Sequence, residues 1–323
     1  MIRKIGLVVF TALILCSVVH TSMAQKSISG MYNVSSGNPE GGNTFLIFDD
    51  HRFVVAFFGG VITGSWAEDG NQINFKPFTN EHKFYVYGRY NENLKDSSRI
   101  FFKGFEKEPT FIGFETQQTN KAILRPVYNP GPSCVPYPST AMFYGKPTRI
   151  LFSHKSDKGD DQALTSEVYS FDQLNKNNDF VAIYHRDDQD KRPFTATFKD
   201  GMLFFNGQDE GSKKQPLPTA GEDFEFIKQV LNAPQTVDKL FYSPFFHETV
   251  ENLHDQNKWR YDVSKNAYIN FQNYVEGEEN RLTEMDAYNM PNIIFQFDIL
   301  KLTDKKPVPS EIEEKPVMIA TCY

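Results

Sequence analysis

The 323-residue chain is poor in the residues that mark several functional classes. It has three cysteines, two tryptophans and seven histidines, and its 34 lysines and arginines are outnumbered by 41 aspartates and glutamates, for a formal net charge of −7. Three cysteines are too few for a small scaffold stapled by disulfides. An acidic chain also lacks the basic face that holds nucleic-acid phosphates, so we expect no nucleic-acid partner.

Several enzyme motifs are missing as well. The chain has no His-Glu-x-x-His zinc motif, no glycine-rich phosphate loop and no Gly-x-Ser-x-Gly nucleophile elbow. His247, Glu251 and His254 share one side of a predicted helix, but the two histidines are about 10.5 Å apart by helical rise, too far to bind one metal ion. The acidic stretches 157–161 and 187–190 match no calcium-loop pattern. We therefore expect no metal ion and no cofactor, although the paired carboxylates of a hydrolase can come from any part of a chain.

The long apolar run of the sequence lies at its N-terminus. Arg3 and Lys4 precede the apolar run 5–19, and small residues follow it up to Ala24. This order is typical of a secretory signal peptide over residues 1–24, cleaved after Ala24. The run is shorter than the roughly 20 residues that a membrane span needs.

Export has consequences for charge and location. Cleavage would remove two positive charges and no negative ones, which takes the net charge from −7 to −9. A lipoprotein processed at Cys16 is an alternative, but Leu15 is bulky for the position before a lipidated cysteine. We expect a periplasmic or extracellular protein with no membrane span after cleavage.

Two cysteines remain in the cleaved chain, Cys134 and Cys322. An even pair in an oxidising compartment predicts a disulfide, which would join a proline-rich segment to the last residues. Two unpaired thiols are the alternative.

The 47 aromatic residues (30 Phe, 15 Tyr and 2 Trp) are concentrated in short apolar runs separated by turn signals. From Ser29 to Arg125 these runs recur about every ten residues, which predicts antiparallel strands in a barrel or sandwich. The fold class we expect is mostly β, with an N-terminal barrel followed by a β-rich α+β region. The expected parts are a signal peptide (1–24), a β-barrel domain (25–126), a proline-rich connector (127–147), a β-rich α+β domain (148–304) and a charged tail (305–323).

The first half carries a recurring set of short motifs: Gly30-Met31-Tyr32, Asn43–Phe48, Gly64-Ser65-Trp66, Asp69-Gly70-Asn71 and Gln72–Phe75. In this order they resemble the small lipocalin-like (calycin-type) domains of secreted bacterial proteins. The first turn departs from the pattern, because it reads Asp49-Asp50-His51 where such domains usually have glycine. The resemblance implies an antiparallel barrel, and it implies no catalytic residues, since these families share none.

The second half predicts further strands and two helices. Lys199-Asp200-Gly201 is a hairpin signal between two strand-like runs. Residues Glu222–Asn232 have an apolar stripe and an acidic first turn. Residues Pro244–His254 follow Ser243, a typical N-cap residue, and start with Pro244, which is typical of the first position of a helix.

The aromatic excess has three interpretations, and one of them is an exposed aromatic surface that stacks on sugars or on a partner. A self-filled barrel core is the simplest interpretation, and a ligand cavity with Phe57, Trp66 and Tyr87 in its lining is the functional one. The sequence favours a non-catalytic binding protein for a small apolar ligand or a cell-envelope component. The alternatives are a protein-interaction or envelope-assembly module without a pocket, and a carboxylate-based hydrolase.

Overall fold

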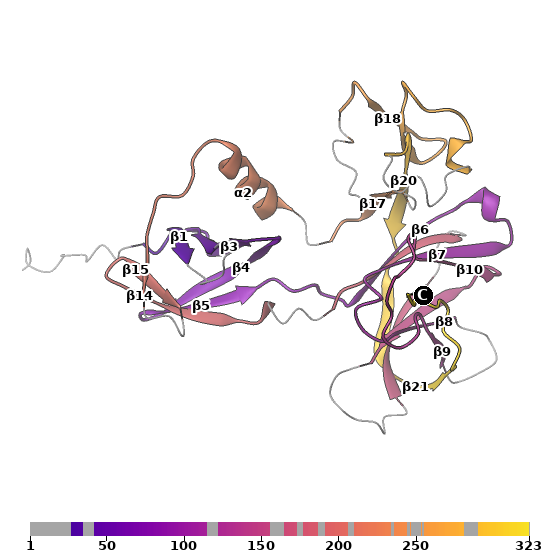
Figure 1. Ribbon diagram of the computed structural model, residues 1–323, viewed down its shortest axis with the longest axis horizontal. Helices are drawn as coiled ribbons and strands as arrows, with labels where there is room; N and C mark the ends of the chain where they lie inside the picture. Colours follow the sequence, from indigo (N-terminus) through magenta and orange to yellow (C-terminus); the bar gives the residue numbers. More distant parts are fainter. Residues whose placement is uncertain are drawn as a thin grey trace, which may run out of the picture. The chain divides into compact units, whose positions relative to one another are not determined.

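A computed structural model describes residues 27–34, 42–114, 122–155, 165–172, 177–186, 191–205, 210–233, 236–243, 246, 253, 255–280 and 290–322. The mostly-β prediction is confirmed (Figure 1). The chain forms two compact units, and each takes two stretches of sequence. Unit 1 comprises residues 1–79 and 188–233, and unit 2 comprises residues 80–187 and 234–323.

Unit 1 is a nearly closed, antiparallel, eight-stranded sheet with the order β1-β2-β3-β4-β5-β14-β15-β16. Its strands are β1 (Gly30–Val34), β2 (Asn43–Ile47), β3 (Arg52–Phe57), β4 (Gly60–Asp69), β5 (Gln72–Pro77), β14 (Phe194–Lys199), β15 (Met202–Phe205) and β16 (Ser212–Lys213). Beyond the last strand, Met31 and Gln215 exchange two backbone hydrogen bonds of 2.9 and 2.8 Å. This bridge brings the first and last strands of the sheet together.

Tight turns join these strands. Asp200 and Gly201 have positive φ angles of 51° and 79° between β14 and β15, as a two-residue hairpin of this kind requires, so the predicted hairpin is confirmed. At the first turn His51 itself takes a positive φ of 63°, a conformation that glycine adopts more readily than histidine. Gly64 has a different role, because a Cβ at this position would lie 2.4 Å from both the Lys76 carbonyl oxygen and the Phe53 ring.

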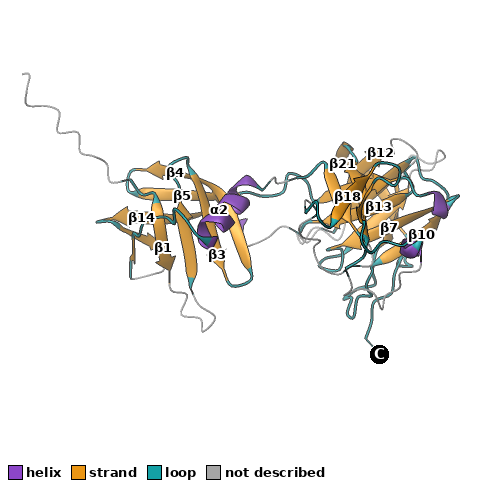
Figure 2. Ribbon diagram, turned by 90° about the horizontal axis from the view of Figure 1, so that it is seen from above, coloured by secondary structure: helices purple, strands orange, loops and turns teal. Residues whose placement is uncertain are grey.

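Helix α2 (Glu222–Asn232) covers the outer face of this sheet (Figure 2), and its bounds are those that the sequence predicts. Ile227 packs with Leu46 and Val54. The last turn of the helix has no basic residue to interact with its free carbonyl groups. Arg52 of β3 takes this role, because its Nη1 donates to the Leu231 carbonyl at 3.1 Å. Strand β3 is therefore covered on both faces, as its uniformly apolar sequence indicates.

Unit 2 packs a mixed sheet against a small closed barrel. The sheet has the order β10-β7-β13-β6-β20-β19-β18, with β17 also paired to β20, and the barrel has the order β11-β12-β21-β9-β8. The sheet strands are β6 (Phe84–Arg89), β7 (Ser97–Lys103), β10 (Thr140–Tyr144), β13 (Asp179–Tyr184), β17 (Lys239–Tyr242), β18 (Trp259–Asp262), β19 (Ala267–Asn270) and β20 (Ile293–Ile299). The barrel strands are β8 (Thr110–Phe114), β9 (Ala122–Pro126), β11 (Arg149–His154), β12 (Thr165–Asp172) and β21 (Leu302–Ile312); the short 3-10 helices are η1 (Glu92–Leu94) and η3 (Glu278–Asn280).

One aromatic core joins the sheet and the barrel of unit 2. Phe84 and Phe180 of the sheet pack with Phe152 and Tyr169 of the barrel, and the Phe84 and Phe152 rings stack 5.4 Å apart. Two strand pairs are parallel, β7 with β13 and β9 with β21.

The two units do not follow the domain ranges expected from the sequence. The barrel-like sheet expected over 25–126 ends its first run at Pro77, and β14, far along the chain, pairs with β5. The chain reaches β14 only after it has built β6 to β13 of unit 2. Hydrogen bonding between distant strands, which no local signal reports, decides this arrangement.

Two segments that the sequence left without strands contain them. Strand β10 lies within the expected connector 127–147, where prolines argue against pairing, but its own five residues contain none. The expected tail 305–323 begins inside β21. Among the described strands, β12 is the one that pairs with residues 302–309 of β21, and β9 pairs only from Ser310 onward. Pro307 and Pro309 therefore lie where one edge of β21 is unpaired, and a strand tolerates the missing N–H of proline at such an edge.

Some expectations fall outside the described residues. These are the signal peptide (1–24), nearly all of the predicted helix 244–254 with His247, Glu251 and His254, and both acidic stretches, 157–161 and 187–190. In the described part of the chain, no helix is long and apolar enough to cross a membrane.

Candidate functional site

The interior of unit 1 is filled by phenylalanine rings. The Phe75 and Phe194 rings stack at 4.9 Å, and the Phe53 ring meets Phe75 edge-on at 5.1 Å. Phe45 and Phe205 lie 4.2 Å apart in the same cluster. The side chains of this barrel-like sheet therefore fill it, as expected for a narrow barrel.

The three aromatic residues expected to line a ligand cavity lie in different surroundings. Phe57, at the end of β3, is 39% exposed, and Trp66 is buried in the core of unit 1. Tyr87 belongs to unit 2, where it packs with Phe101 and Phe297 on the face of the sheet turned away from the barrel. The structure does not bring these three side chains into one site, and ligand binding by them stays a prediction.

Trp66 has a clear structural role. Its Nε1 donates to the Phe48 carbonyl at 3.0 Å, and its ring lies 4.7 Å from the ring of His51. Its backbone N–H donates to the His51 carbonyl at 2.9 Å. Trp66 thus holds the turn in which His51 takes its unusual backbone conformation.

Unit 2 contains a groove of about 460 Å³ that the sequence analysis did not identify. Three segments form it: the approach to β8, the segment after β9 and the chain after β21. Its lining is mainly apolar with four charged residues, and it comprises Glu106, Lys107, Glu108, Pro109, Thr110, Phe111, Pro126, Tyr128, Asn129, Pro130, Gly131, Pro132, Glu314 and Pro316. A volume in this range suits a small organic ligand.

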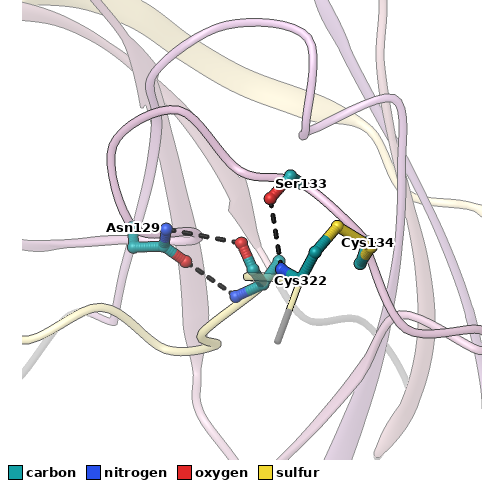
Figure 3. Close-up of a disulfide and its surroundings, with 5 residues drawn as sticks. Asn129, Ser133, Cys134 and Cys322 are labelled. Atoms are coloured by element: carbon teal, nitrogen blue, oxygen red, sulfur yellow. Dashed lines mark hydrogen bonds between the residues drawn. A yellow bond between two sulfur atoms is a disulfide. The ribbon is translucent and has the colours of Figure 1, made fainter.

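The predicted disulfide between Cys134 and Cys322 is present and braces this groove (Figure 3). Its Cα atoms are 5.2 Å apart across 188 residues of sequence. Beside it, the Ser133 hydroxyl accepts a hydrogen bond from the Cys322 N–H at 3.3 Å. The Asn129 side chain accepts from the Ala320 N–H at 2.7 Å and donates to the Ala320 carbonyl at 3.4 Å. The proline-rich wall and the last residues of the chain are therefore held together.

Fixed polar groups lie along the groove. Arg125, at the end of β9, donates to the carbonyls of Lys315 and Pro316 at 2.8 Å each, which fixes the third segment. Glu108 accepts a hydrogen bond from the Tyr184 hydroxyl and forms an ion pair of 2.8 Å with Arg186. These contacts leave Glu108 as a held, largely compensated carboxylate.

Tyr128 is the most buried aromatic residue of the lining. Burial is the main cause that raises the pKa of its hydroxyl to about 12, so the side chain is neutral at physiological pH. Together with Phe111 it gives the groove an uncharged aromatic surface.

The lining of the groove contains the carboxylates of Glu106, Glu108 and Glu314, and Glu108 is occupied by Arg186 and Tyr184. Among the described residues, no group of three histidine, cysteine, aspartate or glutamate side chains could hold a metal ion.

Sequence reasoning missed this groove for a definable reason. The prolines around it were interpreted as a connector because they cannot support a strand ladder. The same residues present rigid apolar rings, and the cysteine pair already indicated that the segment meets the C-terminal residues.

Comparisons with known proteins assign no family to the chain. No family model matches it, and no curated protein or solved structure shows a significant match. The functional inference therefore rests on the geometry of the two units.

Proposed function

We propose that this chain is a non-catalytic binding protein and that the groove of unit 2 holds a small, mainly apolar ligand. The observation that carries the proposal is the groove itself, with a volume of about 460 Å³ and walls of proline and aromatic side chains. Rigid walls favour affinity, because little side-chain freedom is lost on binding. The disulfide and the Asn129 contacts provide this rigidity.

Export to an oxidising compartment fits this function, whereas the lipocalin-like resemblance concerns unit 1, whose interior is filled. A disulfide persists in an oxidising compartment, which fits a cleaved signal peptide over residues 1–24 and a periplasmic or extracellular location. Unit 1 has the nearly closed antiparallel sheet that a lipocalin-like domain requires. The intact mass of the exported protein tests the location, because cleavage after Ala24 makes Gln25 the first residue.

A neutral apolar dye tests binding in the groove. N-phenyl-1-naphthylamine is titrated into the full chain, and we expect saturable fluorescence enhancement with one site. The Pro132→Trp variant places an indole in the groove and should abolish binding. Pro136→Trp is the matched control, since Pro136 is exposed in the same proline-rich segment but lies outside the lining.

The outcomes of this experiment are distinct. Binding that Pro132→Trp removes and Pro136→Trp retains supports the groove as the site. Absence of saturable binding, or equal binding by both variants, contradicts it. Native mass spectrometry of the protein purified from its own source then identifies the ligand by its mass.

A second function is favoured by a separate observation in unit 1. Its interior is filled, while Phe57 and Phe58 at the β3–β4 turn are exposed to 39% and 78%. Exposed aromatic side chains at a hairpin tip suit contact with another protein. Crosslinking in the native extract of the wild type and of a Phe57→Ser, Phe58→Ser double variant tests this function, and an unchanged pattern argues against it.

A further inference from the structure

Unit 2 has a second hollow, a polar cleft of about 550 Å³ that shares no residue with the groove. It lies where β6 and β7 meet the loops next to β17, β18 and β20. The cleft is lined by Arg89, Tyr90, Asn91, Glu92, Asn93, Leu94, Arg99, Ser243, Ser264, Lys265, Glu276, Gly277, Glu279, Ile293 and Phe295.

Two arginines of the cleft are held by one buried carboxylate. Asp179 is completely buried, and its Oδ1 accepts from the Arg99 Nε at 2.9 Å. Its Oδ2 accepts from the Arg99 Nη2 at 2.8 Å and from the Arg89 Nε and Nη2 at 2.8 and 2.7 Å. Burial by itself raises the pKa of Asp179, but the hydrogen bonds and charges of Arg99 and Arg89 together lower it below its ordinary value. The carboxylate is thus charged and fixes both guanidinium groups.

These guanidinium groups keep unused donors. Arg89 also lies over the Phe295 ring, with its Cζ 3.7 Å from the ring centre, which fixes its plane. In the described part of the chain, the Nη1 of neither Arg89 nor Arg99 has a hydrogen-bond partner. Both side chains line the cleft, so it contains rigid donors at no further cost in side-chain entropy.

The lining carries charges of both signs, and the buried Asp179 that holds both arginines adds one more negative charge. Three cations, Arg89, Arg99 and Lys265, accompany three carboxylates, Glu92, Glu276 and Glu279. A strongly charged ligand would meet groups of its own sign. An apolar ligand would desolvate polar groups without replacing their hydrogen bonds, which is unfavourable by about 1–3 kcal/mol for each group.

A polyhydroxylated neutral molecule fits this lining better. Each of its hydroxyls both donates and accepts, so it can use guanidinium donors and carboxylate acceptors together. Tyr90, which is 55% exposed, adds an aromatic ring against which the C–H face of a sugar can pack. The Lys146 Nζ lies 5.7 Å from the centre of this ring.

We propose that this cleft binds a neutral saccharide of a few sugar units. The site goes beyond the proposed function, because it lies apart from the apolar groove and takes a ligand of opposite polarity.

Calorimetric titration of the full chain tests the proposal with defined probes. These are the neutral oligosaccharides maltohexaose, cellohexaose and N,N′-diacetylchitobiose, and an oligogalacturonate as the anionic comparison. We expect at least one neutral probe to bind and the Tyr90→Ala variant to weaken it about tenfold, the effect of losing an aromatic contact of about 1.4 kcal/mol. Tyr144→Ala, at a tyrosine of the same unit that is 96% exposed and outside the cleft, should bind as the wild type does.

Other results would overturn the proposal. Binding of the oligogalacturonate alone indicates an anion site, and absence of binding by every probe argues against a saccharide site of any kind. Unchanged affinity in Tyr90→Ala places the saccharide elsewhere. Pro132→Trp separates the two proposals, since it should abolish dye binding in the groove and leave saccharide binding unchanged.

Discussion

The two units of this chain are stabilised in different ways although both are β structures. Unit 1 buries a cluster of phenylalanine rings inside one antiparallel sheet and covers the sheet with helix α2. Unit 2 adds a disulfide and a buried Arg89–Asp179–Arg99 network to its aromatic core. Both hollows described above, the groove and the polar cleft, lie in unit 2. In unit 2 the disulfide lies beside Asn129 of the groove, and Arg89 and Arg99 of the charge network line the polar cleft.

The two tryptophans report on the units separately, since Trp66 lies in unit 1 and Trp259 in unit 2. In a Trp259→Phe parent protein the remaining Trp66 fluorescence reports the unfolding of unit 1. In a Trp66→Phe parent protein the remaining Trp259 fluorescence reports the unfolding of unit 2. Each variant below is compared with its own parent protein in urea unfolding.

The largest expected effect is the loss of the disulfide. The Cys134→Ser, Cys322→Ser double variant should lower the free energy of unfolding of unit 2 by about 4–5 kcal/mol, because the bridge closes a long loop in the unfolded chain. Fluorescence of Trp259 measures it, and dithiothreitol should reproduce it in the parent. Unit 1 should be unchanged, and an equal loss in both units would mean that they unfold together.

The next effect comes from the charge network. Asp179→Asn keeps the shape of the side chain but leaves two largely buried guanidinium groups without their counter-ion, which should destabilise unit 2 by about 3–5 kcal/mol. Asp172→Asn is the matched control, because its pair with Arg149 is half-exposed and is expected to contribute less than about 1 kcal/mol. Similar losses in the two variants would show that burial of Asp179 does not matter.

A smaller effect is expected from the core of unit 1. Phe75→Leu removes ring carbons from the stacked pair with Phe194 and should lower the stability of unit 1 by about 1–2 kcal/mol. Fluorescence of Trp66 measures it, while the unfolding midpoint of unit 2 should stay the same. An unaltered unit 1 would mean that its interior is not tightly packed.

The smallest effect concerns pH. Burial and the positive charge of Lys83 lower the pKa of His154 in unit 2, and the Lys155 backbone, Glu108 and Glu167 oppose them in part. The folded state therefore binds the proton less readily than the unfolded chain, whose histidine pKa is about 6.5. The stabilisation is present above that value and is lost as the pH falls through the lowered folded-state pKa.

Replacement of this histidine tests the pH effect. His154→Gln should reduce the pH dependence of the unit 2 unfolding midpoint on the acid side, as read from Trp259. Unit 1 serves as the internal control. A pH profile identical to that of the parent would assign the effect to other groups.

Local signals predicted many of the elements. Alternating apolar runs, the turn at Asp200 and Gly201 and the stripe of Glu222–Asn232 each correspond to an element of the structure. They succeed because strand and helix periodicity and turn chemistry act over a few residues. The aromatic lining of a cavity, in contrast, was placed on Phe57, Trp66 and Tyr87, which the fold puts in two units. Composition reveals aromatic residues but not which face or unit contains them.

The sequence by itself determined the β class, the cysteine pair and the helix of unit 1, because each depends on residue type and short-range spacing. Only the tertiary structure decided that β14 pairs with β5, that the last strand closes a barrel and that Arg89 and Arg99 share Asp179. These features join residues tens to hundreds of positions apart. The free energy of each of these contacts depends on how both partners are buried and oriented in the folded chain. The sequence around one partner alone does not contain that information.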